Sequence, residues 1–136
     1  MTKKLLTASI LFYIVSAILI IIGVIYSLTP GLLPYHERFI GKTIEELDPK
    51  LVVLAIMSLR IIGAAFTAIG VGTIMLTAKP LKEGYTWARW TIITVLMINL
   101  LPAMKVTLTV GKDTPWWAIG IMIILSLIGF FLSKSE

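Results

Sequence analysis

Four long apolar stretches occupy most of this chain, at residues 5–28, 51–77, 86–108 and 116–133. An α-helix needs about 20 predominantly apolar residues to cross a hydrocarbon core of ~30 Å, and each stretch has roughly that length. Backbone amides inside a bilayer must be hydrogen-bonded without water, which a helix achieves within a single segment. The sequence therefore predicts an all-α integral membrane protein, an antiparallel four-helix transmembrane bundle that forms a single domain.

Composition excludes several other classes of protein. The chain has 136 residues, of which 58% are hydrophobic, and it contains no cysteine, so disulfides and thiolate metal centres are excluded. The net charge of +5 would favour nucleic acid in a soluble protein, but basic residues beside membrane segments ordinarily reflect topology and anionic lipid. The expected partner is the lipid bilayer and not nucleic acid. Lys3 and Lys4 precede an apolar run that is too long for a cleavable signal peptide, which predicts an uncleaved first helix.

Aromatic and basic residues indicate how the bundle sits in the membrane. Tyrosine and tryptophan gather in two groups, which predict one interfacial belt at each membrane face: Tyr85, Trp87 and Trp90, and Trp116 and Trp117. Six basic residues lie on the side that holds both termini and the connection between the second and third spans, and five lie on the other side. We therefore expect both termini in the cytoplasm.

Capping residues and prolines predict where the helices begin. Asp48 and Thr114 precede Pro49 and Pro115, and each is expected to be the N-cap of the span that follows, with its proline in the first turn. The connection between the first two spans is too apolar for a freely solvated loop. Thr43 in this connection has capping-box spacing to an acid three residues later, which predicts a short helix from residue 44. We expect the connection to lie on the membrane surface or to cap one end of the bundle.

Small residues at helical spacing predict close packing between the first two spans. Such faces let helix backbones approach one another when lipid is as apolar as leucine. The predicted faces are Ser9, Tyr13, Ser16, Ile20, Gly23 and Ser27 in the first span, and Ala64, Ala68 and Gly72, with Gly63, Thr67 and Gly70 beside them, in the second.

Arg60 is the polar residue that most constrains the interior. An unpaired guanidinium facing lipid costs ~2.5 kcal/mol or more near the bilayer centre, so Arg60 is expected to face the interior or to extend toward the headgroups. Small residues continue its face at i+4 spacing, which favours the interior. No Asp or Glu lies within any span, so the candidate partners are an acid of the first connection, Asn99, a carbonyl freed by Pro102, or an anionic ligand.

Other polar residues converge on the same end of the bundle. Asn99 and Lys105 of the third span fall in the non-cytoplasmic half, and His36 and Glu37 belong to the connection that covers it. Together with Arg60 they form the predicted ligand-binding residues. His36 is the only histidine, and one imidazole is too few for a metal site, so we expect it to hold the connection by a hydrogen bond or to serve in acid–base chemistry.

The chain resembles the DoxX-like group of small four-helix membrane proteins of bacteria and archaea, including its uncharacterised branches. The residues that carry the resemblance are Leu59-Arg60-x-x-Gly63 with Gly70, the series Pro34-Tyr35-His36, Gly41 and Leu47-Asp48-Pro49, and Trp87-Ala88-Arg89. This resemblance implies a four-helix bundle and, in some members, a role as a small subunit beside quinone-linked enzymes. It implies no catalytic residues.

Three classes of function fit these observations. We expect an accessory or structural subunit that packs against a membrane-protein partner or a second copy of itself. The alternative is a binding or transport module for an anionic or amphiphilic small molecule, such as a lipid or a quinone, in a pocket near Arg60 and Asn99. A membrane-embedded enzyme ranks third, because no Ser/His/Asp set, phosphate-binding glycine loop or dinucleotide fingerprint is present, and no cofactor is expected.

Overall fold

The structure, a computed structural model, describes residues 1–134 and is all-helical over this range. The elements are α1 (Lys3–Leu28), α2 (Pro34–Ile40), the short η1 (Ile44–Glu46), α3 (Pro49–Leu76), its π-helical extension η2 (Thr77–Leu81), α4 (Thr86–Val110) and α5 (Trp116–Leu132). The prediction of an all-α fold is confirmed, and α2 is a helix that the sequence reasoning did not predict.

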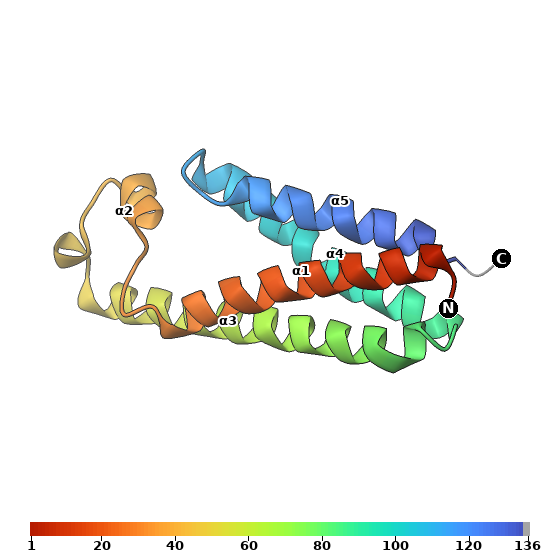
Figure 1. Ribbon diagram of the computed structural model, residues 1–136. Helices are drawn as coiled ribbons and strands as arrows, with labels where there is room; N and C mark the ends of the chain where they lie inside the picture. Colours follow the sequence, from red (N-terminus) through yellow and green to blue (C-terminus); the bar gives the residue numbers. More distant parts are fainter. Residues whose placement is uncertain (135–136) are drawn as a thin grey trace.

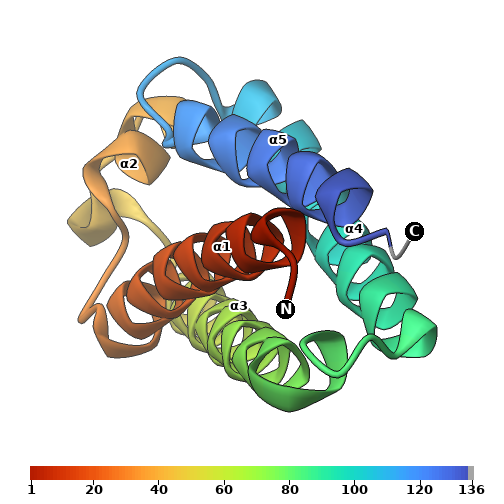
Figure 2. The ribbon, with the colours of Figure 1, turned by 45° about the vertical axis from the view of Figure 1, so that its right-hand side comes forward.

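The long helices pack side by side, with α1 in contact with α3 on one side and α5 on the other (Figures 1 and 2). α3 runs antiparallel to α1, and α4 packs against both α5 and α3. Within residues 1–134, three helices are long and apolar enough to cross a membrane: α1, α3 with η2, and α4. α5 is apolar as well, with 17 residues.

The α1–α3 contact is a backbone contact made through glycine. A Cβ atom added to Gly23 would lie 2.6 Å from the carbonyl oxygen of Gly63, and one added to Gly63 would lie 2.6 Å from the backbone nitrogen of Ser27. Thr67, one turn beyond Gly63, donates its hydroxyl to the Gly63 carbonyl at 2.9 Å, so this hydroxyl is paired within its own helix. The predicted close approach of the first two spans is therefore present.

The face of the second span that contacts α1 is not the expected one of Ala64, Ala68 and Gly72 but the neighbouring face of Gly63 and Gly70. Gly63 and Gly70 are buried against α1, whereas Ala64 and Ala68 are exposed. No atom lies within 4 Å of a Cβ added to Gly72. The two faces are adjacent on the helix. Gly63 and Gly70 allow a closer approach to α1 than Ala64 and Ala68 would, so their face makes the contact.

Helix ends follow the prediction at α3 and depart from it at α5. Asp48 caps α3 as expected, since its carboxylate accepts from the Lys50 N–H at 2.8 Å. Thr114 was expected to cap α5, but Pro115 holds that position. The Thr114 hydroxyl contacts the carbonyl oxygens of Thr107 at 2.9 Å and Gly111 at 2.7 Å, so it closes the end of α4 instead.

The first connection contains two short helices. The turn predicted at residue 44 is present as η1, with the Thr43 N–H donating to the Glu46 carboxylate at 3.0 Å. α2 begins with Pro34 in its first turn and ends at Gly41, which has φ +74° and donates its N–H to the Glu37 carbonyl at 2.8 Å. Proline at the start and a left-handed glycine at the end are the signals that favour a helix between them.

We predict that Gly63→Ala destabilises the protein by about 1–3 kcal/mol, because the new Cβ would overlap the Ser27 backbone. Gly72→Ala is the matched control on the same helix. Its Cβ meets open space, so stability is expected to stay unchanged or to rise by ~0.5–1 kcal/mol through helix propensity. Chemical denaturation in mild detergent measures both, and equal effects of the two substitutions would contradict the glycine contact.

Candidate ligand-binding cavity

An apolar cavity of about 310 Å³ lies between the helices at the end that carries α2. All four long helices and α2 contribute to its wall. The lining residues are Ile22, Tyr26, His36, Leu59, Ile62, Ala65, Phe66, Asn99, Pro102, Ala103, Val106, Thr107, Pro115 and Ile119. None of them is Asp, Glu, Lys or Arg, so the wall offers a bound molecule apolar contact and a few neutral polar groups. Its size and chemistry match those of small-molecule sites.

Asn99, one of the residues that line this cavity, carries an unpartnered polar atom. Its side-chain carbonyl oxygen is buried, and no group in residues 1–134 donates a hydrogen bond to it. A buried acceptor without a donor costs about 1–3 kcal/mol, so native proteins rarely retain one. The residue therefore fits a role in holding a ligand that supplies a donor.

His36 contributes the second polar group of the cavity wall. Its Nδ1 accepts a hydrogen bond from the Leu33 N–H at 3.2 Å, which fixes the start of α2 and leaves the ring proton on Nε2. Nε2 has no hydrogen-bond partner within the described chain, so it is available as a donor. Burial lowers the pKa of His36, and the ring is therefore neutral at pH 7.

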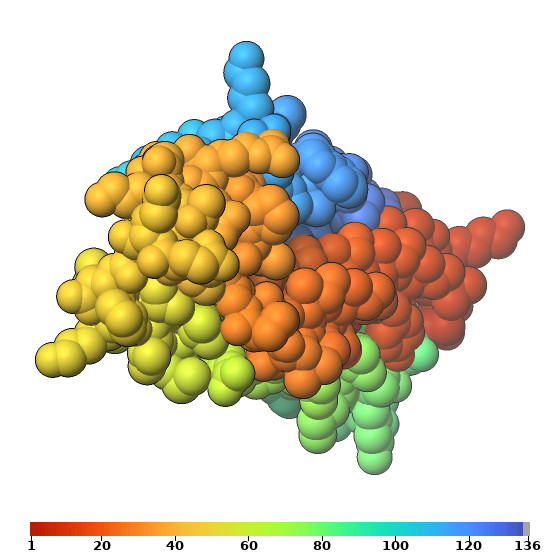
Figure 3. Space-filling view, turned by 90° about the vertical axis from the view of Figure 1, so that its left-hand side faces the viewer, coloured from red at the N-terminus to blue at the C-terminus, as the bar shows by residue number. Residues whose placement is uncertain are grey.

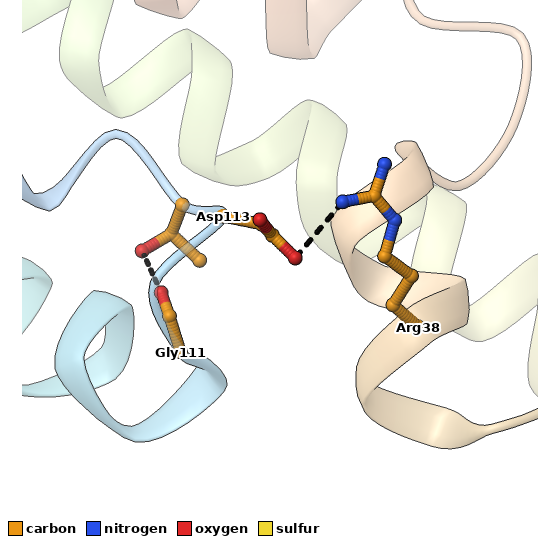
Figure 4. Close-up of polar contacts among 4 residues, drawn as sticks. Arg38, Gly111 and Asp113 are labelled. Atoms are coloured by element: carbon orange, nitrogen blue, oxygen red, sulfur yellow. Dashed lines mark hydrogen bonds and ion pairs between the residues drawn. The ribbon is translucent and has the colours of Figure 1, made fainter.

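Two contacts hold α2 over the cavity. The hydroxyls of Tyr26, in α1, and Tyr35, in α2, hydrogen-bond at 2.7 Å, and burial together with this bond raises the pKa of Tyr35 above its ordinary value. Arg38 of α2 pairs with Asp113, in the α4–α5 turn, at 2.9 Å (Figure 4). Figure 3 shows α2 and the rest of the connection, in orange and yellow, covering this end of the molecule.

The structure brings together two of the five predicted site residues. Asn99 and His36 line the cavity, but Arg60 and Lys105 do not, and both are exposed. Arg60 makes no ion pair or hydrogen bond within residues 1–134. Glu37 also lies outside the cavity wall, where its carboxylate accepts from the Ile44 N–H at 3.2 Å and joins α2 to η1.

The position of Arg60 follows from the α1–α3 contact. Gly63 lies against Ser27, close to the end of α1, so Arg60, one turn earlier in α3, lies level with that end. It is therefore near one end of the packed helices and on the flank of α3, not deep between them. Arg60 is exposed, so it does not face the interior as the sequence favoured, and its position does not require a buried carboxylate partner.

Sequence reasoning missed Tyr26 and Thr107 as parts of the cavity wall. In the sequence both are ordinary residues near the ends of apolar stretches, with no pattern that marks them. Only the packing of distant segments brings them into the same cavity wall as Asn99. No group of three or more His, Asp or Glu side chains that could hold a metal ion occurs in the part of the chain that the structure describes.

Comparison of the chain with known protein families, curated proteins and solved structures finds no match. The resemblance to DoxX-like proteins stays a prediction from short motifs.

We predict that His36 titrates below its ordinary pKa of 6.5. Because it is the only histidine, its imidazole resonances report the titration directly by NMR in detergent. The folded state binds this proton less readily than the unfolded chain, so stability is greatest above about pH 6.5 and falls as the pH is lowered through and below that value. In His36→Asn, which keeps an acceptor near the Nδ1 position but does not titrate, this part of the pH dependence should vanish. A measured pKa at or above 6.5 would contradict burial of the ring.

Proposed function

We propose that this chain is a membrane-embedded binding protein for a neutral amphiphilic small molecule, held in the interhelical cavity under α2. The observation that carries the proposal is the buried, unpartnered carbonyl oxygen of Asn99, a residue in the wall of an otherwise apolar cavity. Such a group lowers stability unless a ligand completes its hydrogen bond, and the surrounding apolar wall fits a hydrocarbon body.

Charge spacing supports insertion as an antiparallel four-helix transmembrane bundle. From Arg60 to Lys79 the second span covers ~28 Å, and from Arg89 to Lys105 the third covers ~24 Å, at ~1.5 Å per residue. Both lengths approximate a hydrocarbon core of ~30 Å. The 17 residues of α5 lie at the short end of the range for a spanning helix. In this arrangement Arg60 and Lys105 mark one membrane boundary, and the basic residues near both termini mark the cytoplasmic one.

The charge of the cavity wall favours a neutral ligand over an anion. Of the predicted ligand classes, an anionic molecule would need Arg60 or Lys105, and neither lines the cavity. A carboxylate in this apolar space would be an unpaired buried charge, which is strongly unfavourable. An uncharged lipid that carries a hydroxyl on an apolar body does not have this penalty and has a donor for the Asn99 carbonyl.

Native mass spectrometry of protein extracted in mild detergent tests this function. Wild type is expected to carry an added mass that Asn99→Leu loses and that Arg60→Ala keeps, because Arg60 lies outside the cavity. Loss of the added mass in Arg60→Ala alone would show instead that an anionic ligand is held at the surface. Absence of any ligand from wild type, both as extracted and after incubation with neutral lipids, would contradict the proposal.

We predict that Asn99→Leu raises the stability of the ligand-free protein by about 1–2 kcal/mol, because a buried acceptor without a donor is removed at nearly constant volume. Denaturation of delipidated protein measures this change. A gain in stability combined with a loss of binding is the signature of a ligand-binding group. A large loss of stability would mean that Asn99 is a structural residue.

A second candidate, the accessory subunit, is favoured by the outward position of Ala64 and Ala68 on α3. Small residues four apart on an exposed membrane helix let a partner helix approach closely. Ala64→Leu is then expected to abolish co-isolation of a partner or formation of an oligomer without changing the mass of the bound ligand. A protein that runs as a monomer with no partner, in wild type and variant alike, would remove this candidate.

A further inference from the structure

A second hollow adjoins the cavity on the outside of the molecule. It is a groove of about 270 Å³ between α2 and α3, and it shares three wall residues with the cavity: His36, Leu59 and Ile62. Its other walls include Phe39 and Ile40, at the end of α2, and Ala55 of α3. The two hollows therefore meet at the same three side chains.

The groove is more uniformly apolar than the cavity. Phe39 and Ile40 remain 58% and 45% exposed, although they belong to a connection between helices rather than to a span. Ser58 is the one hydroxyl of its wall, and this hydroxyl already donates to the Leu54 carbonyl at 2.8 Å. A molecule in this groove finds apolar surface, with only the shared His36 offering a polar group.

The cavity has room for a polar head and part of a chain, and the groove continues from it past the three shared residues. Its two unpartnered groups are complementary in type, since the Asn99 carbonyl needs a donor and the His36 Nε2–H needs an acceptor. A hydroxyl supplies both, whereas an ester or ketone supplies only an acceptor.

We propose that the cavity and the groove together bind one neutral, single-chain amphiphile with a hydroxyl head, of the class of long-chain alcohols. The head lies in the cavity beside Asn99 and His36, and the chain leaves past Leu59 and Ile62 to lie in the groove against Phe39 and Ile40. This inference rests on the proposed function and adds to it the ligand class and the path of the chain.

Two photoreactive analogues of hexadecanol test the path of the chain. One carries a diazirine beside the hydroxyl and the other near the far end, and each is added to the full-length protein in phosphatidylcholine nanodiscs. The head-labelled probe is expected to cross-link to the cavity wall near Asn99, and the tail-labelled probe to Phe39, Ile40 and Ala55, as mapped by peptide mass spectrometry. Excess hexadecanol should suppress both, and Asn99→Leu should lower both about tenfold, the effect of one lost hydrogen bond.

Ala55→Trp fills the groove and is expected to lower cross-linking by the tail-labelled probe at least tenfold. Ala64→Trp, an equal enlargement on the exposed side of the same helix, should leave it unchanged. Circular dichroism checks that each variant is folded, and Ala55→Met provides a smaller filling residue if Ala55→Trp does not fold.

The outcomes separate this inference from the function on which it rests. Competed labelling of the cavity by the head probe, with tail labelling spread over the lipid-facing helices and insensitive to both Ala55 substitutions, would overturn the groove and leave the function standing. If excess hexadecanol suppressed labelling neither in the cavity nor in the groove, both this inference and the proposed function would be overturned. If palmitate suppressed cross-linking as well as hexadecanol does, the inference that the ligand has a neutral hydroxyl head would be wrong.

Discussion

The glycine contact between α1 and α3 sets the rotation of α3, and the rest of the site depends on that rotation. Gly63 can approach the α1 backbone only if its own face turns toward α1. Leu59, Ile62 and Phe66 follow at helical spacing beside it, so the same rotation directs them into the space shared with α4 and α5. If α3 were rotated so that Ala64 and Ala68 faced α1, these three side chains would point away from the cavity.

The same rotation keeps the cavity free of charge. With Gly63 facing α1, Arg60 lies on the exposed flank of α3, and Lys105 is exposed on α4. A guanidinium inside the apolar space would need a buried carboxylate, and the spans contain none. The protein therefore places neutral groups, Asn99 and His36, where a charged pair would be costly. The proposed preference for uncharged molecules rests on this placement of charges.

The sequence predicted the features that depend on neighbours in the chain. Asp48 before Pro49 predicted the start of α3, and Thr43 predicted the turn at residue 44, because capping bonds span only two or three residues. Helical spacing predicted that small residues pack α1 against α3. Helical spacing did not show whether the face of Gly63 and Gly70 or the face of Ala64 and Ala68 makes this contact. The two faces lie about one residue apart on the helix surface and differ only in how closely a partner can approach.

The remaining features depend on contacts between distant segments. Arg89 entered the sequence analysis only as part of the Trp87-Ala88-Arg89 motif and as one of the basic residues counted for topology. In the structure its Nε–H donates to the Phe130 carbonyl at 2.9 Å, and its guanidinium lies 3.9 Å from the centroid of the Phe130 ring. Thr114 was assigned to the helix after it and serves the helix before it. Asn99 was recognised as unusual, but its lack of a donor is a property of the assembled wall and not of the third span.

The cover of the cavity is attached more weakly than the helices beneath it. No residue of α2 is buried, and its ion pair joins side chains that are 65% and 59% exposed, so this pair contributes only about 0–1 kcal/mol. The Tyr26–Tyr35 hydrogen bond is the stronger tie because it is half-buried. Local opening of α2 would break these contacts but would not disturb the α1–α3 crossing, which lies outside the cover. Segments with little buried surface open at a small fraction of the global free energy of unfolding. Opening of α2, which would give access to Asn99, is thus physically separate from unfolding of the α1–α3 pair.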